Sequence, residues 1–138
     1  MLRFSIIAAA FAVASTAHAD PCKAVPDRGP IPPTVRQGQV FSGPVTYVVD
    51  GDGICVAIGQ GERNWVEVRI ADFYAPELRE PGGEQAKVAM TRLALGRTVR
   101  CVAGRRSYDR IVATCTLGGV SLGSLMRRAG VAEGGRGR

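Results

Sequence analysis

From residue 40 onward, much of the chain alternates between apolar and polar positions with a period of two, which is typical of β-strands. The clearest case is residues 65–70, where Val66, Val68 and Ile70 share one face and the other side chains share the opposite face. Turn signals, such as Asp50–Gly53, separate these stretches. The pattern predicts five strands, at residues 45–49, 54–58, 65–70, 97–103 and 111–117.

Two other stretches repeat their apolar residues with the period of an α-helix. Residues 83–95 place four apolar side chains on one face, and Gly96 follows as a stop signal. Residues 120–129 show a similar spacing and are followed by Gly130. The resulting order of three strands, helix, two strands and helix fits a five-stranded OB-fold β-barrel of the α+β class. One helix follows the third strand and one follows the fifth.

The rest of the chain divides into segments around this barrel. We expect a signal peptide at residues 1–19, an extended proline-rich arm at 20–40, the barrel domain at 41–132 and a mobile tail of glycine and arginine at 133–138. A chain of 138 residues is expected to hold one domain. We also expect the protein to be a monomer.

The first nineteen residues have the pattern of an export signal. Arg3 precedes a short apolar run at residues 6–13, and Ala17–Ala19 fits a small-x-small cleavage site. The apolar run is shorter than the about 20 residues that span a bilayer, although an uncleaved anchor is the alternative. Cleavage before Asp20 would give a secreted or periplasmic protein with no membrane attachment. It would also remove His18, the only histidine, and with it any imidazole chemistry.

All four cysteines follow the predicted cleavage site. An even number of cysteines in a small exported domain indicates disulfides, and four cysteines allow three pairings. We favour Cys101–Cys115, because both lie in apolar runs on either side of a turn, as across a hairpin. This choice leaves Cys22–Cys55 to tie the arm to the barrel. A zinc site is disfavoured because the chain has no C-x-x-C spacing and no histidine after cleavage.

Arginine dominates the positive charge of the chain. The formal net charge is +6, and Lys23 and Lys87 are the only lysines. Because arginine binds phosphate through two parallel hydrogen bonds, a polyanionic partner fits this composition. A basic exported protein without such a partner is the alternative.

Three short segments combine carboxylates with arginine: Val-Asp-Gly-Asp at 49–52, Val-Arg…Ala-Pro-Glu at 68–77, and Tyr-Asp-Arg at 108–110. With the helix start at 83–86, they resemble, in the same order, the motifs of the staphylococcal-nuclease-like (thermonuclease) family. The resemblance extends from about Phe41 to Val131. It implies an OB-fold enzyme that uses calcium to hydrolyse phosphodiester bonds of DNA or RNA.

The resemblance also implies a role for individual residues. Arg69 and Arg110 would contact the scissile phosphate, where positive charge stabilises the transition state. Glu77 would act as the general base or orient the attacking water. Asp52 would be a calcium ligand, supported by Asp50.

Further positions are expected to contact the substrate or the metal. Tyr74, Tyr108 and Arg106 are candidate substrate-binding residues. Tyr74 stands where the family has an acidic calcium ligand, and a neutral phenol binds calcium poorly, so we expect a weakened calcium site. Asp72 would substitute as a ligand if the backbone stays extended, because it then points to the same face as Tyr74. The third, C-terminal helix of the family is expected to be missing.

Two other functions remain open. The chain would be a catalytically impaired OB-fold module if it binds single-stranded nucleic acid without cleaving it, with Tyr74 stacked on a base. It would be a disulfide-stabilised structural protein if the motif residues have ordinary roles. In that case Arg69 would pair with Glu67 or Asp72, the aspartates at 50 and 52 would only form a turn, and Arg110 would belong to a generic basic loop.

Overall fold

A computed structural model describes residues 20–134 of the chain. The predicted signal peptide and the last four residues of the predicted tail lie outside this range. Within it, no helix is long and apolar enough to cross a bilayer.

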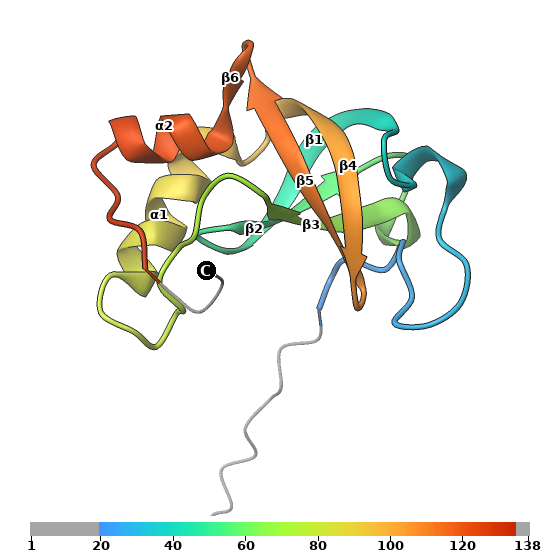
Figure 1. Cartoon of the computed structure of the whole chain (residues 1–138), viewed down its shortest axis with the longest axis horizontal. Helices are drawn as coiled ribbons and strands as arrows, with labels where there is room; N and C mark the ends of the chain where they lie inside the picture. Colours follow the sequence, from blue (N-terminus) through green and yellow to red (C-terminus); the bar gives the residue numbers. More distant parts are fainter. Residues whose placement is uncertain (1–19, 135–138) are drawn as a thin grey trace, which may run out of the picture.

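The strands form a closed barrel, as the sequence predicts (Figure 1). Neighbours follow the order β3-β2-β1-β4-β5-β6 and are antiparallel, and a parallel pairing of β3 with β5 closes the sheet. Five strands make the barrel, and the two-residue β6 extends one edge of β5. The strands are β1 (Val40–Asp50), β2 (Gly53–Ala57), β3 (Trp65–Ile70), β4 (Thr98–Ser107), β5 (Arg110–Leu117) and β6 (Val120–Ser121).

Strand β1 begins five residues before the predicted start, because it pairs with two different strands. Its first half, Val40–Pro44, pairs with β4, and from Val45 onward it pairs with β2. Gly43 allows this change of partner, since a Cβ there would clash with the carbonyl of Ala57. Local propensity did not indicate a strand here, because glycine and proline are poor strand formers.

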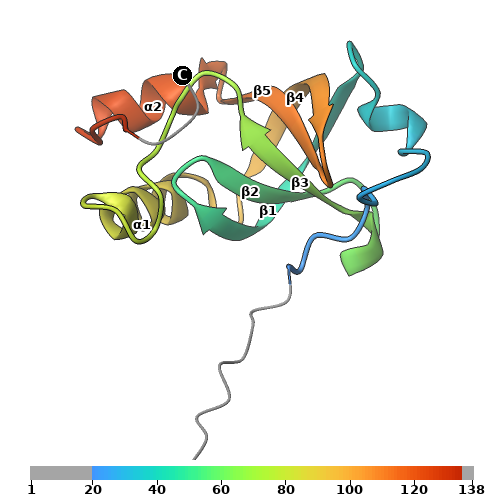
Figure 2. The same cartoon turned by 60° about the horizontal axis from the view of Figure 1, so that its bottom comes forward.

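Two helices cover one end of the barrel, α1 (Gly83–Ala94) and α2 (Leu122–Arg128) (Figures 1 and 2). The buried face of α1 carries Met90 and two alanines and packs against β1. Helix α2 starts two residues later than predicted because the preceding residues pair with β5 as β6. Ser121 then caps it by accepting a hydrogen bond from the backbone N–H of Ser124. Within the described residues no helix follows α2.

The arm is more than an extended tether, because part of it packs into the core of the barrel. The arm wraps the end of the barrel opposite the helices (Figure 2). It contains the short 3-10 helix η1 (Pro33–Val35). A second 3-10 helix, η2 (Glu62–Asn64), lies outside the arm and precedes β3. Val25 and Val35 are buried in the same core as the barrel residues. Backbone hydrogen bonds from Ala24 to Trp65 and from Gly38 to Ala103 fix the arm to β3 and β4. The folded domain therefore includes the arm.

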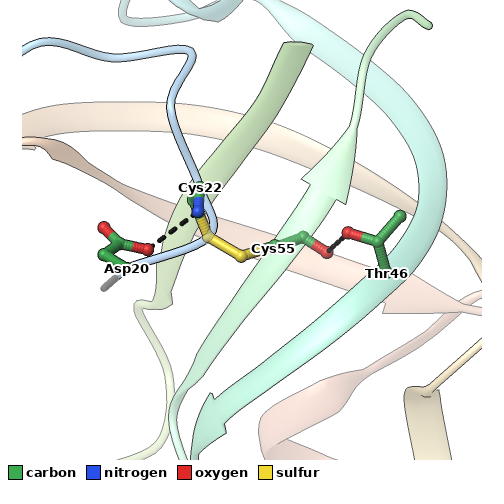
Figure 3. Close-up of a disulfide and its surroundings, with 4 residues drawn as sticks. All are labelled: Asp20, Cys22, Thr46 and Cys55. Atoms are coloured by element: carbon green, nitrogen blue, oxygen red, sulfur yellow. Dashed lines mark hydrogen bonds between the residues drawn. A yellow bond between two sulfur atoms is a disulfide. The ribbon is translucent and has the colours of Figure 1, made fainter. Parts of the chain in front are cut away.

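Both favoured disulfides are present. Cys101 and Cys115 are direct partners across β4 and β5, with their Cα atoms 4.0 Å apart. Cys22 is bonded to Cys55 of β2 and so anchors the arm (Figure 3). Two disulfides are compatible with an oxidising compartment outside the cytoplasm.

Candidate functional site

The parallel pairing of β3 with β5 brings the predicted arginines together. Glu67 lies opposite Arg110 and Arg69 lies opposite Val112, so the outward-facing side chains of both strands share one surface. This surface contains a polar cavity of about 220 Å³. Its lining includes three arginines and one tyrosine: Arg69, Arg105, Arg110 and Tyr74.

Arg69 is held at this cavity by an aspartate from another turn. Its Nη2 lies 3.5 Å from Oδ2 of Asp52. The same carboxylate oxygen accepts a hydrogen bond of 3.0 Å from the backbone N–H of Ala75. Asp52 therefore joins three segments: the β1–β2 turn, β3 and the loop that precedes α1. The partner of Arg69 is Asp52 rather than Glu67 or Asp72.

Asp52 is a buried acid, with only 4 % of the residue exposed. Burial is the main cause that raises its pKa to about 7, and the neighbouring Asp50 raises it further. Arg69 and the Ala75 N–H oppose this shift by stabilising the charged form. Asp50 also accepts a hydrogen bond from the backbone N–H of Asp52, at 3.2 Å, as residues of an Asx turn do.

Tyr74 is fixed by the C-terminal segment. Its N–H donates to Oε1 of Glu133 at 3.2 Å, and its carbonyl accepts from the N–H of Gly134 at 2.8 Å. Glu133 also forms an ion pair of 3.4 Å with Arg127 of α2. Glu133 and Gly134, the first two residues of the predicted mobile tail, are therefore part of the fold. Both form hydrogen bonds with the backbone of the cavity residue Tyr74.

Arg105 lines the cavity and was not among the predicted site residues. Its neighbour Arg106, which was predicted to bind substrate, is not among the residues that line the cavity. The Arg106 guanidinium donates to the carbonyls of Pro26, Gly29 and Tyr108, with distances of 2.6 Å to Gly29 and 2.7 Å to Tyr108. It therefore fixes the arm to the β4–β5 hairpin. A register shift in β4 between Ala103 and Arg106 separates the two arginines in this way, and the sequence gives no signal for it.

Tyr108 lies at the tip of the β4–β5 hairpin and is 77 % exposed. Its φ of 58° is in the left-handed region, which is uncommon for a residue other than glycine. Tyr108 is not among the residues that line the cavity. Its aromatic ring is exposed on the surface, and in the sequence it precedes the cavity residue Arg110 by two positions.

Glu77 is exposed in the loop before α1, and it is not among the residues that line the cavity. Its carbonyl accepts a hydrogen bond from Glu80 and packs closely against Gly83, where a Cβ would clash. The loop is nevertheless attached to the site, because Ala75, two residues earlier, is hydrogen-bonded to Asp52.

Asp72 does not meet the condition for replacing the missing metal ligand. The backbone turns at Ala71 and Asp72 instead of staying extended. The carboxylate lies against Gly123 in α2, where an added Cβ would be 2.5 Å from Asp72 Cγ. One of its oxygens is buried without a hydrogen-bond partner.

The acids of this site were tested against the geometry that calcium requires. Within residues 20–134, Asp50, Asp52 and Asp72 do not gather into a group of three possible ligands. Calcium takes six to eight oxygen ligands, and Asp52 already uses one oxygen for Arg69 and Ala75. The residues present therefore do not fit a tight calcium site.

Comparison with known proteins adds no relative. No model of a protein family matches the chain, and no curated protein matches it at a significant level. The resemblance to the thermonuclease family consequently rests on the motifs and their order alone.

Proposed function

We propose that this chain is a nuclease-like phosphodiesterase that acts on single-stranded DNA or RNA, with weakened calcium dependence. The observation that supports this most strongly is the cavity in which Arg69, Arg105 and Arg110 converge. Three guanidiniums next to one polar cavity match the charge and geometry of a phosphodiester. The exposed ring of Tyr108 and the phenol of Tyr74 would supply stacking surfaces for the bases.

In this proposal the arginines bind the non-bridging oxygens and stabilise the negative charge that grows on them in the transition state. Asp52 orients Arg69, so the guanidinium loses little conformational freedom when phosphate binds. A water molecule oriented by Glu77 attacks phosphorus and transfers a proton to that carboxylate. The P–O bond to the leaving oxygen breaks, and this oxygen takes a proton from solvent to leave as an alcohol. Because the acids do not fit a tight calcium site, no step is assigned to a metal ion.

A second candidate function is a module that binds single strands without cleaving them. The exposed position of Glu77 outside the cavity favours it, because a general base must reach the attacking water. Loop closure on substrate would be needed for the enzyme, since catalytic contacts are often long in the free state. Both functions use the same arginine cavity.

The test is cleavage of a fluorescent single-stranded DNA by the oxidised chain that begins at Asp20, with calcium and with EDTA. The variants to compare are Glu77→Gln, Arg69→Ala and Arg110→Ala. The matched control is Arg92→Ala, because Arg92 is an exposed arginine of α1. We expect cleavage that depends on Glu77, Arg69 and Arg110 but not on Arg92. Binding that requires Arg69 and Arg110, without cleavage in any metal, would favour the binding module. Neither binding nor cleavage would contradict both.

A further inference from the structure

A second group of acids lies on the barrel beside the arginine cavity. The carboxylate oxygens of Asp20, Glu67 and Asp109 all lie within 4.8 Å of one another. They come from the start of the arm, from β3 and from the turn between β4 and β5. Glu67 is only 9 % exposed although it is on the outer face of its strand, where sequence patterning predicts a solvated side chain.

The group lacks a balancing cation among residues 20–134. In the part of the chain that the structure describes, no hydrogen-bond donor from outside the group reaches the Glu67 carboxylate, and no ion pair of 4.0 Å or less involves it. Arg110, opposite Glu67 in the register, acts on it only through longer-range attraction. Burial, followed by the charges of Asp20 and Asp109, raises the pKa of Glu67 to about 8.

The other charged and titratable groups around Glu67 are also accounted for. Lys87 and Tyr47 line the same cavity of about 350 Å³ as Glu67 and Asp20, but the Lys87 ammonium lies over the Tyr47 ring, 5.8 Å from its centre. Arg69, two residues along β3, is paired with Asp52. None of these side chains completes the group.

Cleavage of the predicted signal peptide would add one cation to the chain. If the signal peptide is cleaved before Asp20, as the sequence predicts, the backbone nitrogen of Asp20 becomes an α-ammonium only a few covalent bonds from the carboxylate of the same residue. Asp20 is held in place, since its Oδ1 accepts a hydrogen bond of 2.8 Å from the N–H of Cys22, and the disulfide fixes Cys22 to β2 (Figure 3).

We propose that the α-ammonium of processed Asp20 is the cation of the Asp20–Glu67–Asp109 group, so that removal of the signal peptide completes a buried ion-pair network. In the unprocessed chain this nitrogen is a neutral amide, and Glu67 can lower its energy only by keeping a proton or attracting Arg110. Processing would supply the positive charge locally and would leave Arg110 available to the neighbouring cavity. The inference rests on cleavage before Asp20 and not on the proposed nuclease function.

The experiment compares three oxidised chains at pH 7: one that begins with a free amine at Asp20, the same chain with an acetylated amine, and one that retains Ala19. Every residue of the hydrophobic core lies at or after Ala24, so each chain contains the whole core. The melting temperature is measured by calorimetry, and the Glu67 carboxyl and the α-amine are titrated by NMR. None of these readouts involves nucleic acid.

We expect the free-amine chain to melt about 3–6 °C higher than the acetylated chain, a shift equivalent to roughly one ion pair in a domain of this size. Its amine should titrate above the ordinary range of about 7.7–8.0, and Glu67 should titrate lower than in the acetylated chain. The chain that keeps Ala19 should behave like the acetylated one, because its ammonium is displaced by one residue.

Substitutions identify the group responsible. Glu67→Gln should remove the difference in melting temperature between the free-amine and acetylated chains. Asp109→Asn should reduce this difference, and because Asp109 is only half-buried, this substitution does not disturb the core. Asp27→Asn, an exposed acid of the same arm, should leave it unchanged. Equal melting temperatures and an ordinary amine pKa would overturn the proposal. A shift of the Glu67 carboxyl NMR signal when calcium is added to the free-amine chain would also overturn the proposal, because the cation would then be a metal ion.

Discussion

Asp52 holds Arg69 at the mouth of the arginine cavity, with 3.5 Å between the carboxylate and guanidinium atoms, while the same oxygen binds the backbone of Ala75. A buried side chain with two partners from different segments contributes to stability as well as to orientation. Its position shows how an Asp-Gly-Asp turn can orient an arginine of a neighbouring strand.

Removal of the Asp52 carboxylate should therefore destabilise the fold. Asp52→Ala leaves the Ala75 N–H without its acceptor in a buried position, which costs about 1–3 kcal/mol of unfolding free energy. Asp52→Asn keeps an acceptor oxygen for Ala75 and should cost less. Urea denaturation measures both, with Asp27→Asn as the exposed control. Equal losses for the two variants would show that the hydrogen bond to Ala75 does not matter.

The adjacent arginines of β4 should respond in opposite ways to substitution. Arg105→Ala should weaken binding of single-stranded DNA about tenfold, as expected for loss of one charged contact, with little change in melting temperature. Arg106→Ala should lower the melting temperature because three carbonyls lose their donor. Its effect on binding should be small once the protein is folded. Fluorescence anisotropy and calorimetry separate the two effects, and a reversed pattern would contradict the site assignment.

The raised pKa of Glu67 gives the stability a pH dependence of known sign. The ordinary value of 4.5 is raised to about 8, so the folded state binds this proton more tightly than the unfolded state. The contribution of Glu67 to the free energy of unfolding is therefore complete below about pH 4.5 and is lost as the pH rises toward 8. In the chain with a blocked amine, thermal melts from pH 5 to 9 should show this decline. Glu67→Gln should make this decline shallower without abolishing it, because the pKa of Asp52 is also raised, to about 7. An unchanged slope in that variant would rule out Glu67 as a cause.

The two disulfides should contribute through different parts of the fold. Replacing Cys101 and Cys115 by serine opens a loop with a sequence separation of 14 residues and should cost about 3 kcal/mol. Replacing Cys22 and Cys55 should instead release the start of the arm. Limited proteolysis should cut residues 20–39 faster in the second variant only. Equal protection of the arm in both variants would contradict its anchoring by Cys22.

Much of the fold follows from the local pattern of the chain. The bounds of β3 were predicted to the residue because Val66, Val68 and Ile70 alternate cleanly with outward-facing residues. The cysteine pairs also followed from their positions. By contrast, the first half of β1 has poor strand propensity and forms only because β4 supplies a partner, so tertiary pairing overrides the local signal.

The site was predicted less completely because its details depend on contacts between distant segments. The sequence places Arg69 and Arg110 in recognised motifs, and the β3–β5 pairing brings them to one cavity. Arg105 lines the cavity and Arg106 does not, and the register shift between Ala103 and Arg106 that accompanies this difference has no signal in the sequence. Glu67 lies beside Asp20, which is 47 residues away along the chain, and local patterning gives no signal for such a contact.

The central claim is that the cavity of Arg69, Arg105 and Arg110 binds a phosphodiester. The most direct measurement is an NMR titration of the guanidinium signals with a short single-stranded DNA, at low and at moderate salt. We expect the Arg69, Arg105 and Arg110 signals to shift together and the shifts to weaken with salt, while Arg92 and Arg106 stay unchanged. Shifts that avoid these three arginines, or no shift at low salt, would contradict the account.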